Sequence, residues 1–232
     1  FDTGRQPVIV VDTDSHILTL RVVPSYKHLG AQYSMNIDVG REIRARLGAA
    51  RQAFEEMKKP LFLNKRLPVA ARMQLFQSLI LSRLLYGCAV WTDVPNALLK
   101  KLEATLMAYY RQIHDVGFWN QDHITDDTFR RAQRLPTFRQ FWARHKLTFL
   151  QHVAQFGAVF HKSLLYRELC TGRGWLSEMR DDLEWLSSFH QLPFEMPHDR
   201  SSWVLAWDAL RSCRPWKGWI RKACAKHLIQ EH

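Results

Sequence analysis

The sequence predicts a mainly α-helical protein whose first segment is a β-hairpin. The N-terminal residues are rich in β-branched side chains, with a run over 8–11 and an alternating stretch from Ile17 to Val23, which is typical of paired strands. From Asp38 onward, apolar residues recur at helical spacing, and Pro and Gly separate the periodic stretches. We expect a β-hairpin over 1–36, a helical bundle over 37–135 and a further helical region over 136–232.

The two predicted strands are joined by residues 12–15, which have the composition of a turn. Asp12 and Asp14 in this segment could together hold Mg²⁺. No third carboxylate accompanies them, and Asp and Ser are common turn residues. We therefore interpret the segment as a turn and predict no metal site there. A polar and aromatic loop follows over 26–30, and a short third strand over 32–33.

Three helices with short connections are predicted to form the bundle. Asp38 is placed to cap the first helix and Pro60 to end it. Pro68 marks the start of the second helix, which is apolar on most faces and should be central. The third helix runs from about Pro95 to His114. The apolar positions expected to pack in the first two helices are Ile43, Leu47, Ala50, Phe54, Met57, Met73, Leu75, Phe76, Leu79, Ile80 and Leu84.

The C-terminal region begins with two predicted helix starts. Thr125 is placed to cap a short helix through Gln133. Pro136 and Thr137 open a long helix that we expect to continue to about Tyr166. The side chains along one side of this helix are Phe141, His145, Phe149, His152, Phe156 and Phe160. We interpret its two histidines as packed core residues, because they are seven positions apart, too far for shared metal ligation.

The charge composition of the chain says more about its function than any single motif does. The chain has 33 Lys and Arg against 22 Asp and Glu, a net charge of +11. This excess favours a polyanionic partner, nucleic acid before anionic membrane, although a merely soluble basic protein has the same composition.

Four scattered cysteines indicate a reduced, intracellular compartment, nuclear or cytoplasmic. No nucleophile elbow, phosphate loop or dinucleotide fingerprint occurs, and we predict no catalytic residue.

A stripe of basic side chains on the first predicted helix is the strongest local signal. Arg44, Arg51 and Lys58 recur every seven residues, beside the apolar face. Between residues 38 and 72, nine Lys and Arg stand against four acidic residues. Such a stripe suits a phosphate backbone. An ordinary solvated helix face with internal Glu–Lys pairs is an equally good interpretation.

A second basic segment, Trp216 to Lys226, alternates Trp with Lys and Arg. Bases of a single-stranded nucleic acid could stack on the Trp rings while the neighbouring cations pair with its phosphates. An amphipathic helix on a membrane surface has a similar composition. We prefer a third interpretation, in which the Trp side chains pack in a core and the cations face solvent.

Several segments, taken in order, resemble the reverse transcriptases of non-LTR (LINE-type) retrotransposons. Tyr26 to Gly30, sequence YKHLG, is similar to the family's primer-grip motif, with His28 in place of the usual aromatic residue. Three further segments resemble successive parts of the family's thumb, and in the third of these Ala89 replaces a common Glu. One more segment resembles a motif downstream of the thumb. These four segments are Ile43–Ala50, Leu67–Phe76, Ile80–Trp91 and Leu147–Gly157.

The resemblance implies a palm remnant, a thumb-like bundle and a downstream helical region without the active centre. The family's catalytic aspartates and fingers would lie upstream of Phe1, so Mg²⁺ would belong to the full-length polymerase and no cofactor to this chain. The expected partners are an RNA–DNA hybrid or duplex and the upstream palm and fingers of the same polyprotein, with no membrane. The alternative function is a non-catalytic basic module that binds RNA or a protein partner. The predicted nucleic-acid-binding residues are Lys27, His28, Arg41, Arg44, Arg51, Lys58, Lys65 and Arg66.

Overall fold

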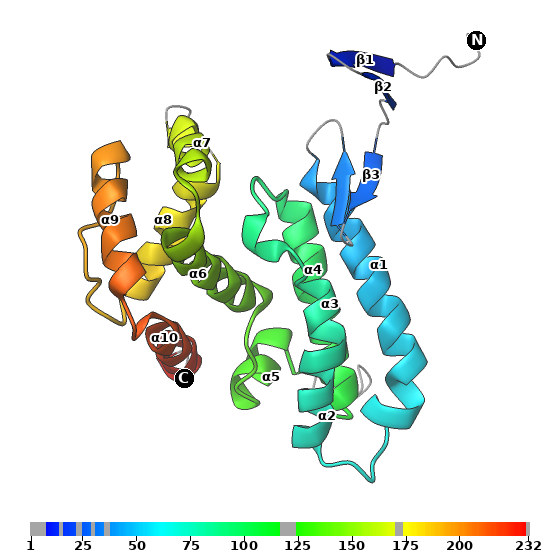
Figure 1. Ribbon diagram of the computed structural model, residues 1–232. Helices are drawn as coiled ribbons and strands as arrows, with labels where there is room; N and C mark the ends of the chain where they lie inside the picture. The colour runs from blue at the N-terminus through cyan, green and yellow to red at the C-terminus, as the bar shows by residue number, and fades with distance from the viewer. Residues whose placement is uncertain are drawn as a thin grey trace.

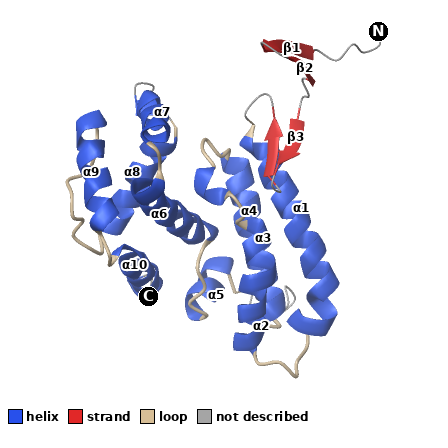
Figure 2. Ribbon diagram, in the orientation of Figure 1, coloured by secondary structure: helices blue, strands red, loops and turns tan. Residues whose placement is uncertain are grey.

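The protein is mainly α-helical, as the sequence predicts (Figures 1 and 2). The computed structural model describes the backbone of residues 8–13, 16–21, 25–28, 31–34, 38–116, 124–169 and 174–230, and most side chains from residue 38 onward. Within these residues, helices and helical turns follow one another from Val39 to Gln230 and are joined by short connections.

Four short strands precede the helices. β1 (Val8–Thr13) is antiparallel to β2 (His16–Arg21), and β3 (Ser25–His28) is antiparallel to β4 (Ala31–Ser34). β3 occupies part of the segment that we expected to be a loop. The side chains of all four strands lie outside the described residues. The palm-remnant interpretation of this segment therefore stays a prediction.

The first bundle helix, α1 (Val39–Met57), begins as predicted. The Asp38 carboxylate accepts a hydrogen bond of 2.8 Å from the Gly40 backbone N–H, which confirms it as the cap. The chain does not stop coiling before Pro60, because a π-helical turn, η1 (Lys58–Phe62), follows directly. The Leu63 N–H donates to the Lys58 carbonyl at 2.8 Å, and this wider turn accommodates a proline that has no N–H to donate.

The second predicted helix is a single run with a π-helical turn at its centre. It comprises α2 (Val69–Phe76), η2 (Gln77–Leu81) and α3 (Ser82–Leu84), and a turn follows that contains Gly87, whose φ of 72° is left-handed. A 3₁₀ turn, η3 (Cys88–Val90), leads to α4 (Asn96–Ile113). Aromatic rings hold these helices together: the Phe54 ring stacks on both Phe62 and Tyr109, with centroids 4.7 and 4.2 Å apart. The helical bundle is confirmed.

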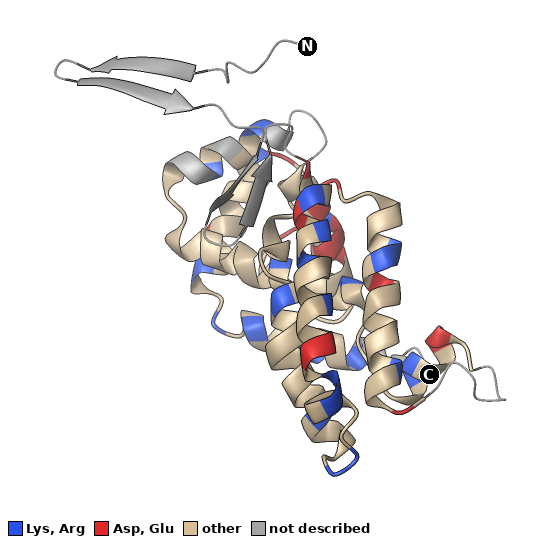
Figure 3. Cartoon of the chain, turned by 90° about the vertical axis from the view of Figure 1, so that its right-hand side faces the viewer, with Lys and Arg blue, Asp and Glu red and all other residues tan. Residues whose placement is uncertain are grey.

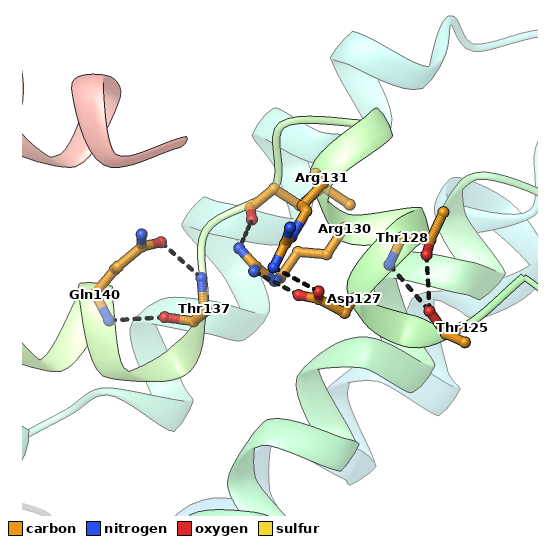
Figure 4. Close-up of polar contacts among 8 residues, drawn as sticks. Thr125, Asp127, Thr128, Arg130, Arg131, Thr137 and Gln140 are labelled. Atoms are coloured by element: carbon orange, nitrogen blue, oxygen red, sulfur yellow. Dashed lines mark hydrogen bonds and ion pairs between the residues drawn. The ribbon is translucent and has the colours of Figure 1, made fainter. Parts of the chain in front are cut away.

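Both helices that follow begin where the sequence predicts, each with a side-chain cap (Figure 4). Thr125 Oγ1 accepts a hydrogen bond of 3.2 Å from the Thr128 N–H at the start of α5 (Asp126–Ala132). Thr137 and Gln140 form a reciprocal capping box at the start of α6 (Phe138–Phe156). Between them, the buried Arg130 guanidinium lies 2.9 Å from the Asp127 carboxylate. Local hydrogen bonding therefore sets both helix starts.

The helix α6 is shorter than predicted, because it ends at Phe156 instead of continuing to about Tyr166. Gly157 leaves the helix with an extended ψ of 124°, and α7 (Val159–Leu169) then starts in a new direction. A Cβ atom at position 157 would lie 2.5 Å from the Val153 carbonyl oxygen, so the bend needs glycine. The remaining helices are α8 (Trp175–Ser187), α9 (Arg200–Ser212) and α10 (Trp216–Gln230).

Helix α6 takes part in two hydrophobic cores. Its first half packs with α1–α4, and its second half packs with α8, α9 and α10 (Figure 1). The Trp142 indole N–H donates to the Cys88 carbonyl at 2.8 Å, and the Trp175 indole N–H donates to the Ala89 carbonyl at 2.6 Å. Lys146, almost fully buried, lies 2.8 Å from an Asp182 carboxylate oxygen on α8. These contacts fix the second core against the first.

Candidate nucleic-acid interface

The basic stripe predicted on the first helix lies on the surface of α1. Arg44 and Arg51 are exposed, and Lys58 is half-buried at the end of the helix. Figure 3 shows Lys and Arg recurring along this helix, which faces the viewer. At a rise of 1.5 Å per residue, the stripe spans about 21 Å. A duplex presents several phosphates over that length.

Two residues of the stripe make ion pairs at the surface. Arg44 lies 3.3 Å from the Asp38 carboxylate, and Lys58 lies 3.4 Å from that of Glu55. The Arg44 and Asp38 side chains are 58% and 50% exposed. Such exposed pairs contribute little to stability, so both cations can turn to a phosphate at small cost.

Other predicted residues extend this surface at both ends of α1. Arg41 is exposed in the first turn of the helix, and Lys65 and Arg66 are exposed in the loop before α2. Asn64 holds that loop: its side-chain oxygen accepts from the Arg66 N–H at 3.0 Å, and its side-chain nitrogen donates to the Pro60 carbonyl at 3.2 Å. The structure thus brings six of the eight predicted residues onto α1 and its adjoining loop. The other two, Lys27 and His28, have side chains outside the described part.

Two basic residues counted with the stripe do not belong to the surface. Arg72 is 4% exposed, donates to the Phe62 carbonyl at 3.0 Å and pairs with Asp115 at 3.1 Å. Arg46 pairs with Glu42 at 2.6 Å and lies over the Tyr86 ring. The count from sequence included Arg72 because its partner Asp115 is distant in the chain. It included Arg46 because an i,i+4 pair with Glu42 looks like an ordinary surface pair in the sequence. The charge available to a ligand is therefore smaller than the count suggested.

A second candidate surface is an open groove of about 760 Å³, which we call the α3–α6 groove. Its walls come from η2, α3 and α6, with Lys217 of α10 at one side. His145 and His152 line it and are exposed, so our prediction that they pack in the core is wrong. The opposite face of α6 supplies the packed residues, among them Leu147 and Leu150. Helical periodicity alone did not show which face was buried.

The Trp-rich segment of α10 confirms the interpretation that its Trp side chains pack in a core while its cations face solvent. The Trp216 ring is fully buried, and its indole N–H donates to the Leu147 carbonyl at 2.8 Å. Arg221 and Lys222 are exposed. These tryptophans therefore contribute to the second core, whereas the neighbouring cations face solvent.

Among the described residues, no three His, Cys, Asp or Glu side chains come together as metal ligands. Within the same residues, no helix is both long and apolar enough to cross a membrane. Comparisons of the chain with protein-family models, curated proteins and solved structures found no match.

Proposed function

We propose that this chain is the part of a retroelement RNA-directed DNA polymerase that holds the template–primer duplex. The observation that carries the proposal is a row of three cations: Arg44 and Arg51, exposed on α1, and Lys58, half-buried where that helix ends. This helix contains the segment that resembles the start of the thumb in LINE-type reverse transcriptases. The order of the other resembling segments supports the same assignment.

In this proposal the chain positions a duplex and does not read its sequence. Guanidinium and ammonium groups along a helix pair with phosphates, which are the same for every base sequence. Each neutralised phosphate releases condensed counterions, so binding weakens as salt rises. Polymerisation would need the metal-binding aspartates of the upstream palm. We therefore expect no primer extension by this chain alone, whatever template or divalent ion is supplied.

Fluorescence anisotropy with RNA–DNA hybrids tests the proposal. Two hybrids of equal length and unrelated sequence should bind with similar affinity. Both affinities should fall steeply between 50 and 200 mM salt, by about 0.9 log units per log unit of salt for each phosphate contacted. Salt-independent binding, or binding of only one of the two sequences, would contradict a phosphate-directed mode.

A further inference from the structure

The α3–α6 groove combines an apolar floor with exposed rings and cations. Leu81, Leu85 and Phe141 form buried parts of its lining. Its rim carries Arg144 and Lys217, both exposed. None of the described residues that line it is acidic. A ligand of this groove should therefore be negatively charged and should carry flat apolar groups.

Three rings stand in a row along the α6 wall. His152 lies between Phe149 and Phe156, with centroid distances of 6.2 and 5.0 Å. Phe149 is held from behind by an edge contact with Trp175 at 5.8 Å. Phe156 is 72% exposed, an unusual position for a phenylalanine. The wall thus places two exposed rings, those of His152 and Phe156, next to the cations.

Three polar side chains of the groove already donate hydrogen bonds to backbone carbonyls. The Ser82 hydroxyl donates to the Ser78 carbonyl at 2.6 Å, and the Thr148 hydroxyl donates to the Arg144 carbonyl at 2.7 Å. The Gln151 amide donates to the Cys213 carbonyl at 2.7 Å. These three groups are thereby engaged within the protein, whereas the rings and cations face the groove and favour recognition by stacking and charge, which tolerate any sequence.

We propose that the α3–α6 groove binds a single-stranded stretch of nucleic acid, whose bases stack on the α6 rings and whose phosphates pair with Arg144 and Lys217. Single strands suit it because their base faces are accessible, whereas a duplex buries them. The proposal rests on the proposed function and deepens it: α1 holds paired nucleic acid, and the groove holds an unpaired strand.

The test uses the whole chain and two double variants. His152→Ala with Phe156→Ala removes two exposed rings, and Arg144→Ala with Lys217→Ala removes both rim cations. Arg214→Ala with Arg221→Ala is the control for charge, because both residues are exposed and neither lines the groove. Leu205→Ala is the control for lost apolar surface, since this side chain is 68% exposed on α9. Circular dichroism checks that each variant is folded.

The probe is a ten-nucleotide single-stranded RNA that carries 2-aminopurine. The ring variant should lose at least tenfold in affinity, because each stacked base contributes strongly, and should lose the quenching of 2-aminopurine. The cation variant should bind more weakly and with a smaller salt slope, while both controls stay within about twofold of wild type. Hybrid-duplex affinity should be unchanged in the ring variant.

If both groove variants bind single-stranded RNA as well as the wild-type chain does, the inference is overturned. An acidic peptide serves as a second probe, and the inference is also overturned if the groove variants weaken binding of this peptide alone. Hybrid binding that depends on α1, together with no single-strand binding, would also overturn it and leave the proposed function standing. Groove-dependent single-strand binding without hybrid binding would support the inference and reject the proposed function.

Discussion

Arg51 and Arg72 both belong to the first bundle, yet the fold gives them different environments. Arg51 is exposed on α1, whereas Arg72 is buried on α2 and bonded to Asp115 and to a backbone carbonyl. The sequence placed both in one basic region, because spacing along a helix does not reveal a partner 43 residues away. Burial therefore separates a candidate ligand contact from a structural residue.

Replacing Arg72 by alanine should affect stability, whereas replacing Arg51 should affect duplex binding. Arg72→Ala leaves a buried carbonyl without its donor and Asp115 without its partner, and should lower the free energy of unfolding by about 2–3 kcal/mol. Arg51→Ala should change it by less than about 0.5 kcal/mol, while weakening binding to a hybrid duplex. Urea denaturation followed by circular dichroism measures the first effect. Equal destabilisation by the two variants would contradict these assignments.

The buried thiol of Cys88 gives the fold a dependence on alkaline pH. Burial raises the pKa of this thiol from 9.0 to about 12. Below pH 9 the thiol is protonated in both folded and unfolded chains and has no effect on pH dependence. Above pH 9 only the unfolded chain loses the proton, so the free energy of unfolding should fall by about 1.4 kcal/mol per pH unit toward pH 12.

Comparison with Cys88→Ala isolates this contribution from that of other groups that titrate at high pH. Denaturation at pH 8 and pH 10 should show a smaller loss of stability in the variant than in the wild-type protein. Parallel losses in the two proteins would mean that the Cys88 pKa is not raised.

At the scale of elements, helix starts were predictable and some helix ends were not. Asp38 and Thr125 cap helices as expected, and Thr137 caps the helix that it was expected to open, because a cap bonds to N–H groups two or three residues away. The break after Phe156 depends on the approach of Gly157 to the Val153 carbonyl, which no periodicity reveals. The two π-helical turns also escaped prediction.

Gly157 provides a direct test of that break. Gly157→Ala would place a Cβ atom 2.5 Å from a carbonyl oxygen and should lower the free energy of unfolding by about 1–3 kcal/mol. Gly48→Ala is the matched control, because nothing lies within 4 Å of its added Cβ in the middle of α1. It should stabilise the protein by up to about 1 kcal/mol. If Gly157→Ala also stabilised it, α6 and α7 could form one continuous helix.

At the scale of the whole molecule, the two candidate surfaces differ in how far the sequence could indicate them. The α1 stripe was predictable, because its members share one helix and one spacing. The groove was not, because it needs residues from 77–89, 141–156 and 217 to meet in space. Its rings form a row in the sequence, but the two histidines among them were assigned to the core. Only the tertiary packing of α6 shows which of its faces is exposed.

The central claim is that α1 is the surface that contacts a nucleic-acid duplex. Arg44→Ala, Arg51→Ala and Lys58→Ala together remove three charges and leave the packed face of α1 intact. Alanine favours helix, so the fold should persist. The control is Arg214→Ala, Arg221→Ala and Lys222→Ala, which removes equal charge from exposed positions around α10, distant from α1 in Figure 1.

The decisive measurement is the salt dependence of hybrid-duplex affinity for the wild-type chain and these two triple variants. The α1 triple should weaken binding on every sequence and reduce the log–log salt slope by up to about 2.7, which is 0.9 for each lost phosphate contact. The control triple should change the slope much less. An equal loss in both triples would show that only net charge matters, and would contradict a duplex interface on α1.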